Sequence, residues 1–200
     1  MKYTLAHIAA NPRLFRFEVG DQDKFVLRPL EPVDAMRLSA FLGNLSNQTR
    51  RAYDLKSYDM EMAQEMCDAI NRYDKLRFIL IEQRSSDCVG LIEYSLDNPI
   101  SDVLRFNKYG LQLDNETDCR IGPCIADDFQ SCGLGTTLLP LCKHIARQLG
   151  KQRIILWGGV RTDNVRAIAY YKKCGFQSFG EFVDHNKIQH FDMMLVIGES

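Results

Sequence analysis

The segment Cys119–Ala126 (CRIGPCIA) constrains the fold more than any other stretch of this 200-residue chain. Its apolar residues predict a β-strand, but Gly122 and Pro123 stand in the middle of it. Proline has no backbone N–H to donate to a sheet ladder, so such a strand must lie at an edge, carry a bulge or be splayed from a neighbour. We therefore expect a sheet whose pairing is interrupted at this point.

Strand patterns and helix patterns alternate along the rest of the chain. Their order is strand, helices, strands, helix, strand, helix and two strands, which predicts a mixed α/β (α+β) fold with a sheet flanked by helices. Strands are expected at 24–30, 77–83, 88–95, 119–126, 153–160, 176–183 and 188–197, and helices at 32–42, 59–73, 133–149 and 164–174.

The composition, 46% hydrophobic and 26% charged, is typical of a folded protein with a full core. The length suits one domain spanning 1–200, with 1–23 as an N-terminal extension and 96–118 as an irregular insertion. With a net charge of −1 the chain has no excess of positive charge, which argues against nonspecific electrostatic binding to nucleic acid or to an anionic membrane. No apolar run approaches the roughly 18 residues of a membrane span.

The chain contains seven cysteines, an odd number, and no pair has the C-x-x-C spacing. This pattern argues against a zinc site and against a disulfide framework. We therefore expect no metal and a set of reduced thiols in a cytoplasmic protein.

The segment 125–136 (IADDFQSCGLGT) joins the interrupted strand to a helix through a loop with two glycines. Gly133 and Gly135 allow the backbone to approach a ligand closely, and the helix that follows presents unpaired N–H groups and a partial positive charge. These features predict a pyrophosphate cradle, although a simple glycine-rich turn before a helix is the alternative. The spacing Q-x-x-G-x-G is neither that of a P-loop nor that of a dinucleotide fingerprint.

A second motif, DNVRAIAYYKKCGF at 163–176, follows the next strand. The Q-x-x-G-x-G loop and this N-x-x-A-x-x-x-Y-x-x-x-G-F helix together resemble the GNAT superfamily of acyl-CoA-dependent N-acyltransferases. The resemblance is strongest over 120–176. It implies a single GNAT-like domain with a mixed, mostly antiparallel sheet of about seven strands, splayed at the fourth.

The resemblance also implies acetyl-CoA as the co-substrate. Backbone groups of Ile125 and Ala126 would bind the pantetheine and polarise the thioester carbonyl, on which charge develops. Asn164 would lie near the pantetheine arm, although it also suits the N-cap of the helix that follows. The residues implied for the pyrophosphate are Gln130, Ser131, Cys132, Gly133, Leu134, Gly135 and Thr136.

Tyr171 stands where the family has a tyrosine that can protonate the departing thiolate, and Tyr170 is the adjacent rival. The general base is not identified by any local spacing. Glu93 is the first choice for it, and a solvated or hydrogen-bonded polar residue is the alternative interpretation for each candidate. The other candidates are Glu116, Asp118, His144, His185 and His190.

The function implied by the resemblance is an N-acetyltransferase that moves the acetyl group of acetyl-CoA to a primary amine by direct attack in a ternary complex. The acceptor is a small molecule or a peptide amine, with no nucleic acid or membrane partner. Family members often dimerise, and the sequence leaves a homodimer open. The alternatives are a catalytically silent acyl-CoA-binding or sensor module and a domain for another phosphorylated ligand.

Overall fold

A computed structural model describes residues 3–21, 24–69 and 75–198. Contacts within the chain divide it into two compact units. Among the described residues, the first unit comprises the stretches within Tyr3–Tyr94 and Gly122–Cys142, and the second comprises Ser95–Ile121 and the chain from Lys143 onward. Strand β5 (Asp118–Ile125) and helix α6 (Leu134–Gln148) each run from one unit into the other.

The first unit is built on strands that follow one another in space as they do in sequence. β1 pairs antiparallel with β2, and β2 pairs antiparallel with β3 in the register Val26↔Ile81. β4 follows β3 in the sheet, and the second half of β5 follows β4. These strands are β1 (Phe17–Val19), β2 (Phe25–Pro29), β3 (Lys75–Glu82) and β4 (Cys88–Ser95).

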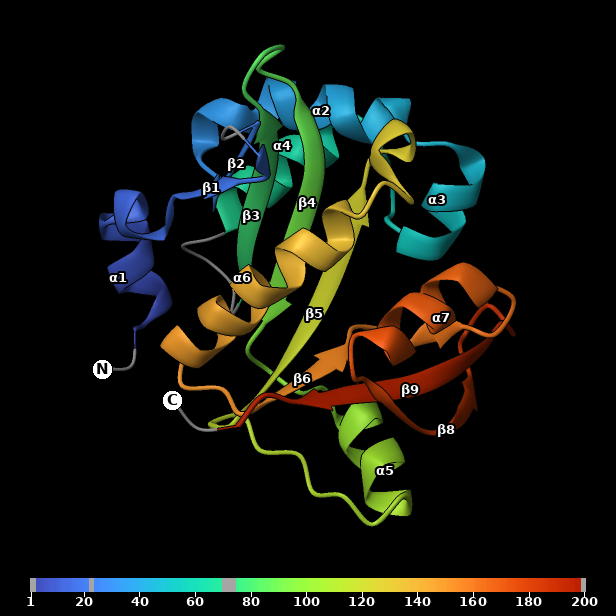
Figure 1. The fold of residues 1–200 in the computed structure, drawn as a ribbon. Helices are drawn as coiled ribbons and strands as arrows, with labels where there is room; N and C mark the ends of the chain where they lie inside the picture. Colours follow the sequence, from blue (N-terminus) through green and yellow to red (C-terminus); the bar gives the residue numbers. More distant parts are fainter. Residues whose placement is uncertain (1–2, 22–23, 70–74, 199–200) are drawn as a thin grey trace. The chain divides into compact units, whose positions relative to one another are not determined.

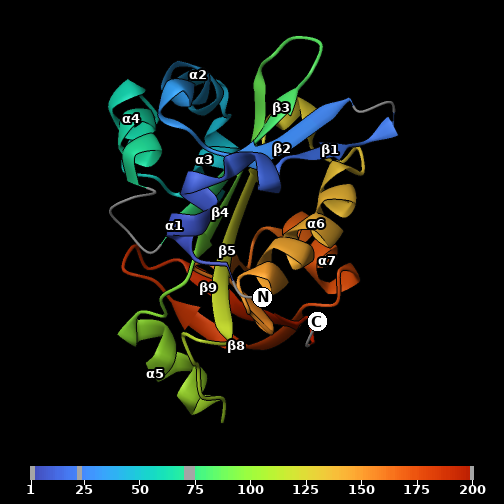
Figure 2. The same ribbon diagram turned by 90° about the vertical axis from the view of Figure 1, so that its left-hand side faces the viewer.

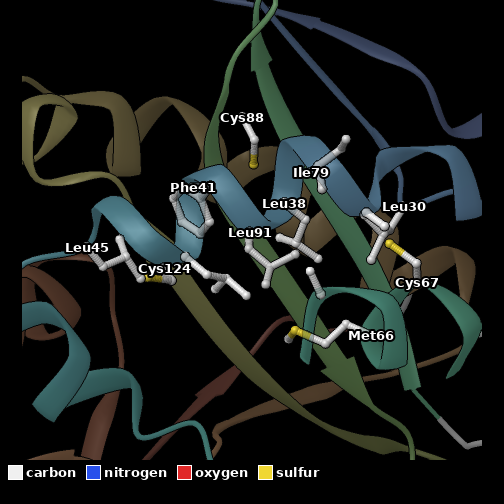
Figure 3. Close-up of a cluster of buried hydrophobic side chains, with 13 residues drawn as sticks. Leu30, Leu38, Phe41, Leu45, Met66, Cys67, Ile79, Cys88, Leu91 and Cys124 are labelled. Atoms are coloured by element: carbon white, nitrogen blue, oxygen red, sulfur yellow. The ribbon is translucent and has the colours of Figure 1, made fainter. Parts of the chain in front are cut away.

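Helices α2 and α4 pack against one face of these strands (Figure 1). Their contact buries Leu38 and Met66 from the helices against Ile79 and Leu91 from the strands, as Figure 3 shows. Burial of such side chains contributes about 1.5–3 kcal/mol each and is the main force that holds the layers together. The helices of this unit are α1 (Leu5–Ala10), α2 (Ala35–Asn44), α3 (Asn47–Tyr53), α4 (Met60–Asp68) and the start of α6.

Ion pairs around Asp34 hold the chain in place where helix α2 begins. Pro32 opens a short 3-10 turn, Pro32–Asp34, as its position before the helix predicts. Asp34 is fully buried and accepts hydrogen bonds from both Arg28 and Arg37, each at 2.7 Å. Burial alone would raise the pKa of Asp34, but its bonds to Arg28 and to the Glu31 N–H outweigh it, so its pKa is lowered.

The second unit is centred on β9. The first half of β5 pairs in parallel with β6, and β6, β7 and β8 each pair antiparallel with β9. The single predicted strand 153–160 is therefore wrong, because two strands replace it. Gly158 and Gly159, with φ of 71° and 69°, turn the chain between them. The strands are β6 (Arg153–Leu156), β7 (Val160–Arg161), β8 (Gln177–Val183) and β9 (Gln189–Val196).

The stretch 96–118 differs from the expected irregular insertion, because it contains helix α5 (Ile100–Lys108). Phe106 of α5 is fully buried and packs with Ile155 and Met194. The helix itself lies beside β9 (Figure 2). Arg105 donates to Asp192 at 2.9 Å and to Asp102 at 2.9 Å. The apolar and ionic contacts together explain why a helix forms here. Helix α7 (Val165–Lys173) is the other complete helix of this unit.

The remaining expectations agree with the structure in type and differ in extent. The mixed, mostly antiparallel sheet is confirmed, with the short strands β1 and β7 in addition to the predicted ones. Because β1 precedes the others, the interrupted strand is the fifth in the numbering used here. The predicted helix 59–73 corresponds to α4, and 70–73 lies outside the described residues. All seven cysteines are free thiols, and no helix in the described part of the chain is long and apolar enough to cross a bilayer.

The Asp34 cluster predicts a pH dependence of stability. The carboxylate of Asp34 contributes stability above its unfolded pKa, and this is lost as pH falls through the lowered folded pKa. We expect Asp34→Asn to reduce the free energy of unfolding by about 3 kcal/mol at pH 7, with a smaller difference in acid. Urea unfolding from pH 2 to pH 7 measures this. The exposed Asp87→Asn is the control, and an equal loss at every pH would contradict the prediction.

Gly180 predicts a tight packing requirement in the second unit. A Cβ at this position would lie 2.3 Å from Cε1 of Tyr109, whose hydroxyl donates to Asp192 at 3.1 Å. We expect Gly180→Ala to lower the free energy of unfolding by about 1–3 kcal/mol, because the ring must move. The double variant Gly180→Ala/Tyr109→Leu should recover part of that loss in thermal unfolding. An additive loss would contradict the contact.

Candidate functional site

Strand β5 leaves its parallel neighbour halfway along its length. Its described register with β6 runs from Asp118↔Arg153 to Ile121↔Leu156, while β5 itself continues to Ile125. Pro123 lies in the part beyond that register, where its missing N–H costs no bond to β6. The predicted interruption of pairing is therefore confirmed, and it exposes backbone of β5 next to the glycine loop.

The loop after β5 has the shape of an anion cradle. Ser131 and Gly133 both have left-handed backbones, with φ of 62° and 87°. Such alternation turns successive N–H groups toward one side and forms a concavity that suits an anion. The next residue, Leu134, begins the 15-residue helix α6, whose N-terminus adds partial positive charge.

Space around this loop suits a phosphate. Ser131, Cys132 and Gly133 are exposed, and a Cβ added at Gly133 would meet no atom within 4 Å. The loop thus has room, charge and backbone donors for a pyrophosphate group. Acetyl-CoA, which the resemblance to the GNAT superfamily implies, carries such a group, and the exposed residues 131–133 leave room for it.

The side chain of Gln130 braces the loop from within. Its amide nitrogen donates to the carbonyl of Ile125 at 2.8 Å and to Oγ1 of Thr49 at 3.1 Å. The neighbouring Ala126 N–H donates to the Val89 carbonyl at 2.9 Å. Two of the predicted contact groups, the Ile125 carbonyl and the Ala126 N–H, are thus occupied within the first unit. The Ile125 N–H remains the donor predicted for the thioester.

Asp127 ties the same loop to α3. It accepts hydrogen bonds from the N–H and Oγ of Ser46, at 2.8 and 2.6 Å, and from Oγ1 of Thr49 at 2.7 Å. Burial would raise the pKa of Asp127, but these bonds outweigh it, and its pKa is lowered. The carboxylate is therefore charged at neutral pH. Sequence reasoning missed this link because its partners lie about 80 residues apart.

Glu93, the predicted base, lies on β4 and is 5% exposed. Its Oε1 accepts from Nε of Arg77 at 2.6 Å, and its Oε2 accepts from the hydroxyl of Tyr53. Burial and the nearby Glu93 charge raise the pKa of Tyr53 well above its usual value, so Tyr53 stays neutral and donates. The sequence analysis missed both partners. The one available signal was an arginine in the otherwise apolar run RFILIEQ.

A cavity of about 220 Å³ has Arg77, the ion-pair partner of Glu93, as part of its wall. Leu55, Met62 and Met66 give the wall an apolar part, and Glu65 gives it an acidic group. The cavity is formed entirely by residues of the first unit. It offers a small, partly apolar space whose wall includes the arginine that binds Glu93.

Two other candidate bases have structural partners in the second unit. Asp118 is fully buried and accepts from Arg153 through both oxygens, at 2.5 and 2.7 Å. His190 contacts Asp184 through Nε2 at 3.2 Å and stacks on Phe182. Both Asp118 and His190 are therefore hydrogen-bonded within the protein, which is the alternative that the sequence analysis gave for each candidate base.

The predicted residues of α7 lie in the second unit. Asn164 is the N-cap of this helix, since its Oδ1 accepts from the Ala167 N–H at 3.1 Å. Tyr171 is half-buried, with its ring 5.2 Å from those of both Tyr170 and Phe176. The structure thus brings the loop residues and Glu93 into the first unit, and Asn164 and Tyr171 into the second.

The profile of the acetyltransferase (GNAT) family matches residues 43–176 of this chain. No curated protein matches the sequence significantly. Solved structures with the same fold include the GNAT domain of S. lividans PAT, with 15% identity, a TM-score of 0.67 and coverage of 92% of this chain and 98% of that one.

Two further structures are similar in fold. The ribosomal-protein-S5-alanine acetyltransferase from Vibrio fischeri has 12% identity, a TM-score of 0.69 and coverage of 90% and 96%. The spermidine N-acetyltransferase from Vibrio cholerae, solved in complex with CoA and spermine, has 19% identity, a TM-score of 0.64 and coverage of 88% and 96%. The family profile spans well over half of the chain, and these structures share its fold. The chain therefore belongs to the GNAT acetyltransferase family.

Proposed function

We propose that this acetyltransferase transfers the acetyl group of acetyl-CoA to a primary amine by direct attack in a ternary complex. The observation that carries the proposal is the strand β5 that leaves β6 after Ile121 and runs into the cradle around Gly133. The thioester of acetyl-CoA supplies the activated acyl group. The cradle binds the pyrophosphate, and the N–H of Ile125 polarises the thioester carbonyl.

Two side chains handle the protons in this proposal. Glu93 accepts a proton from the amine, directly or through water, and Tyr171 donates a proton to the departing thiolate. The contact with Arg77 supports the role of Glu93, since it holds the carboxylate in one orientation inside the first unit. Tyr171 holds its position through the ring of Phe176.

The state of the cysteines supports direct attack rather than an acyl-enzyme. Burial raises the pKa of Cys88 to about 12 and also raises that of Cys124, so both remain thiols at neutral pH. The exposed Cys132 donates its S–H to the Phe129 carbonyl at 2.9 Å. Free thiols throughout also suit the reducing cytoplasm that we propose for this protein.

The acceptor belongs to the class of small amines or peptide amines. The cavity beside Arg77 admits a small amine or the end of a peptide, and its apolar wall suits the carbon chain of either. The spermidine and ribosomal-protein acetyltransferases of this fold are examples of both kinds. The cavity wall carries charges of both signs, negative at Glu65 and positive at Lys75 and Arg77, so the choice between these amines rests on the acceptor assay below.

One observation favours a second candidate, a binding module without transfer activity. Both oxygens of Glu93 already accept a hydrogen bond, from Arg77 and Tyr53, so an acceptor amine would have to compete with these partners for the carboxylate. Both candidates predict that the protein binds acyl-CoA, but only the acetyltransferase predicts turnover.

Thermal unfolding with acetyl-CoA tests the cradle. A ligand at a hundredfold excess over its Kd stabilises the native state by about 2.7 kcal/mol, so the Tm should rise with acetyl-CoA and not with ATP or NAD. Gly133→Val should abolish the rise, because its side chain enters the cradle. Gly110→Val is the matched control, since its φ of 78° and open surroundings give the same backbone cost in the second unit. Equal shifts in both variants would contradict the assignment.

Turnover tests Tyr171. We expect Tyr171→Phe to lower kcat by about 10²-fold or more while the acetyl-CoA shift of Tm is kept, because the phenyl ring preserves packing and loses the proton. Release of free CoA thiol measures the rate, with spermidine, glycinamide and an alanine-terminated peptide as acceptors. Tyr170→Phe is the matched control. Unchanged turnover in Tyr171→Phe would remove the residue from the mechanism.

A further inference from the structure

Helix α3 is a short element whose place depends on polar contacts. It spans Asn47–Tyr53, and Thr49 is its buried residue. Tyr53, the last residue, packs partly against the core cluster of the first unit. Seven residues with so little apolar burial gain little stability from packing, and a helix this short is marginal by itself. Its ends must therefore be held by other groups.

The first end is held by the glycine loop. Asp127 accepts from Ser46, the N-cap of α3, and from Thr49, while Gln130 donates to Thr49. Asp127 is charged, and hydrogen bonds to a charged group are about twice as strong as neutral ones. The loop predicted to bind pyrophosphate and the start of α3 therefore move together.

The C-terminal end of α3 contacts Glu93. Tyr53 donates its hydroxyl to Oε2, while Arg77 holds Oε1. The chain is fixed directly after Tyr53, because the hydroxyl of Tyr58 donates to the Arg50 carbonyl at 2.8 Å and accepts from the Leu55 N–H at 3.1 Å. The orientation of the Glu93 carboxylate thus depends on where α3 ends.

We propose that Thr49 and Tyr53 are positioning residues, and that α3 links the acyl-CoA loop to the carboxylate that serves the acceptor amine. The helix is about 10 Å long at 1.5 Å per residue. When a ligand fixes the conformation of the loop at one end, the helix therefore also fixes the position of Tyr53 at the other end. Binding of acyl-CoA then fixes Glu93 for proton transfer. This inference rests on the proposed function and adds a route by which one substrate prepares the site for the other.

Hydrogen–deuterium exchange tests the link without any acceptor, with CoA as the probe. In the wild type, CoA should slow exchange both in the loop 127–136 and in α3, because exchange reports local opening. Thr49→Val keeps the shape and removes the hydroxyl, so CoA should still protect the loop and no longer protect α3. Thr4→Val is the control, since it removes the hydroxyl of another helix start, where Thr4 caps α1 by accepting from the His7 N–H. Protection of the loop without protection of α3 in the wild type would overturn the link.

A double-mutant cycle tests the consequence for turnover, with acetyl-CoA and the best of the three acceptors named above. Tyr53→Phe should lower kcat about tenfold, the effect of one hydrogen bond to a charged group, and leave the KM for acetyl-CoA within about twofold. Thr49→Val should lower kcat about fivefold. If both act through Glu93, the double variant should lose about tenfold rather than about fiftyfold. A loss equal to the product of the single losses would overturn the proposal.

Failure of this inference and failure of the proposed function give different results. Suppose that Glu93→Gln abolishes turnover while Tyr53→Phe and Thr49→Val leave kcat unchanged. Glu93 is then supported as the general base, and the proposed link through α3 is wrong. If CoA protects no part of the wild-type loop, the proposed function fails and the link fails with it. Normal turnover in Glu93→Gln would also overturn the link, because α3 would then end at a carboxylate that the reaction does not use.

Discussion

A missing hydrogen-bond donor at Pro123 shapes the strand on which the site depends. A strand in the interior of a sheet normally pairs along its whole length, because an unpaired backbone group away from water costs free energy. In β5 the described parallel register with β6 stops at Ile121, before the proline. The backbone from Gly122 to Ile125 is thereby released for a different partner. The glycine loop follows directly after that strand, so the part of β5 without a partner in β6 leads into the loop proposed to bind the pyrophosphate.

Each buried carboxylate in the described part of the chain contacts an arginine, in both units. Asp34 contacts Arg28 and Arg37, Glu93 contacts Arg77, and Asp192 contacts Arg105. Such pairs contribute little net stability, because desolvation offsets the attraction, yet loss of one partner is costly. Their effect is therefore to fix geometry. At Asp34 the geometry is that of a helix start, at Asp192 it is that of the contact with helix α5, and at Glu93 it is that of the carboxylate proposed to accept the proton.

The sequence predicted those elements whose signals are local. The interrupted strand 119–126, the hairpin of β8 and β9 and the helix after Asn164 all carry an apolar period, a proline or a cap within a few residues. Helix α3, with the sequence NQTRRAY, has no such period, and its contacts with Asp127 lie far along the chain. The partners of Glu93 were missed for the same reason. Pairing between distant side chains is decided by the folded backbone, which a window of neighbouring residues does not contain.

The contact between Gly180 and Tyr109 has an evolutionary consequence. The two positions share one volume, since the tyrosine ring occupies the place of the side chain that residue 180 lacks. Relatives that keep helix α5 should therefore change these positions together, with a larger residue at 180 accompanied by a smaller one at 109. Relatives without the helix should be under no such restriction at 180, because nothing there would exclude a Cβ. The residue types at positions 109 and 180 therefore indicate together whether a homologue contains helix α5.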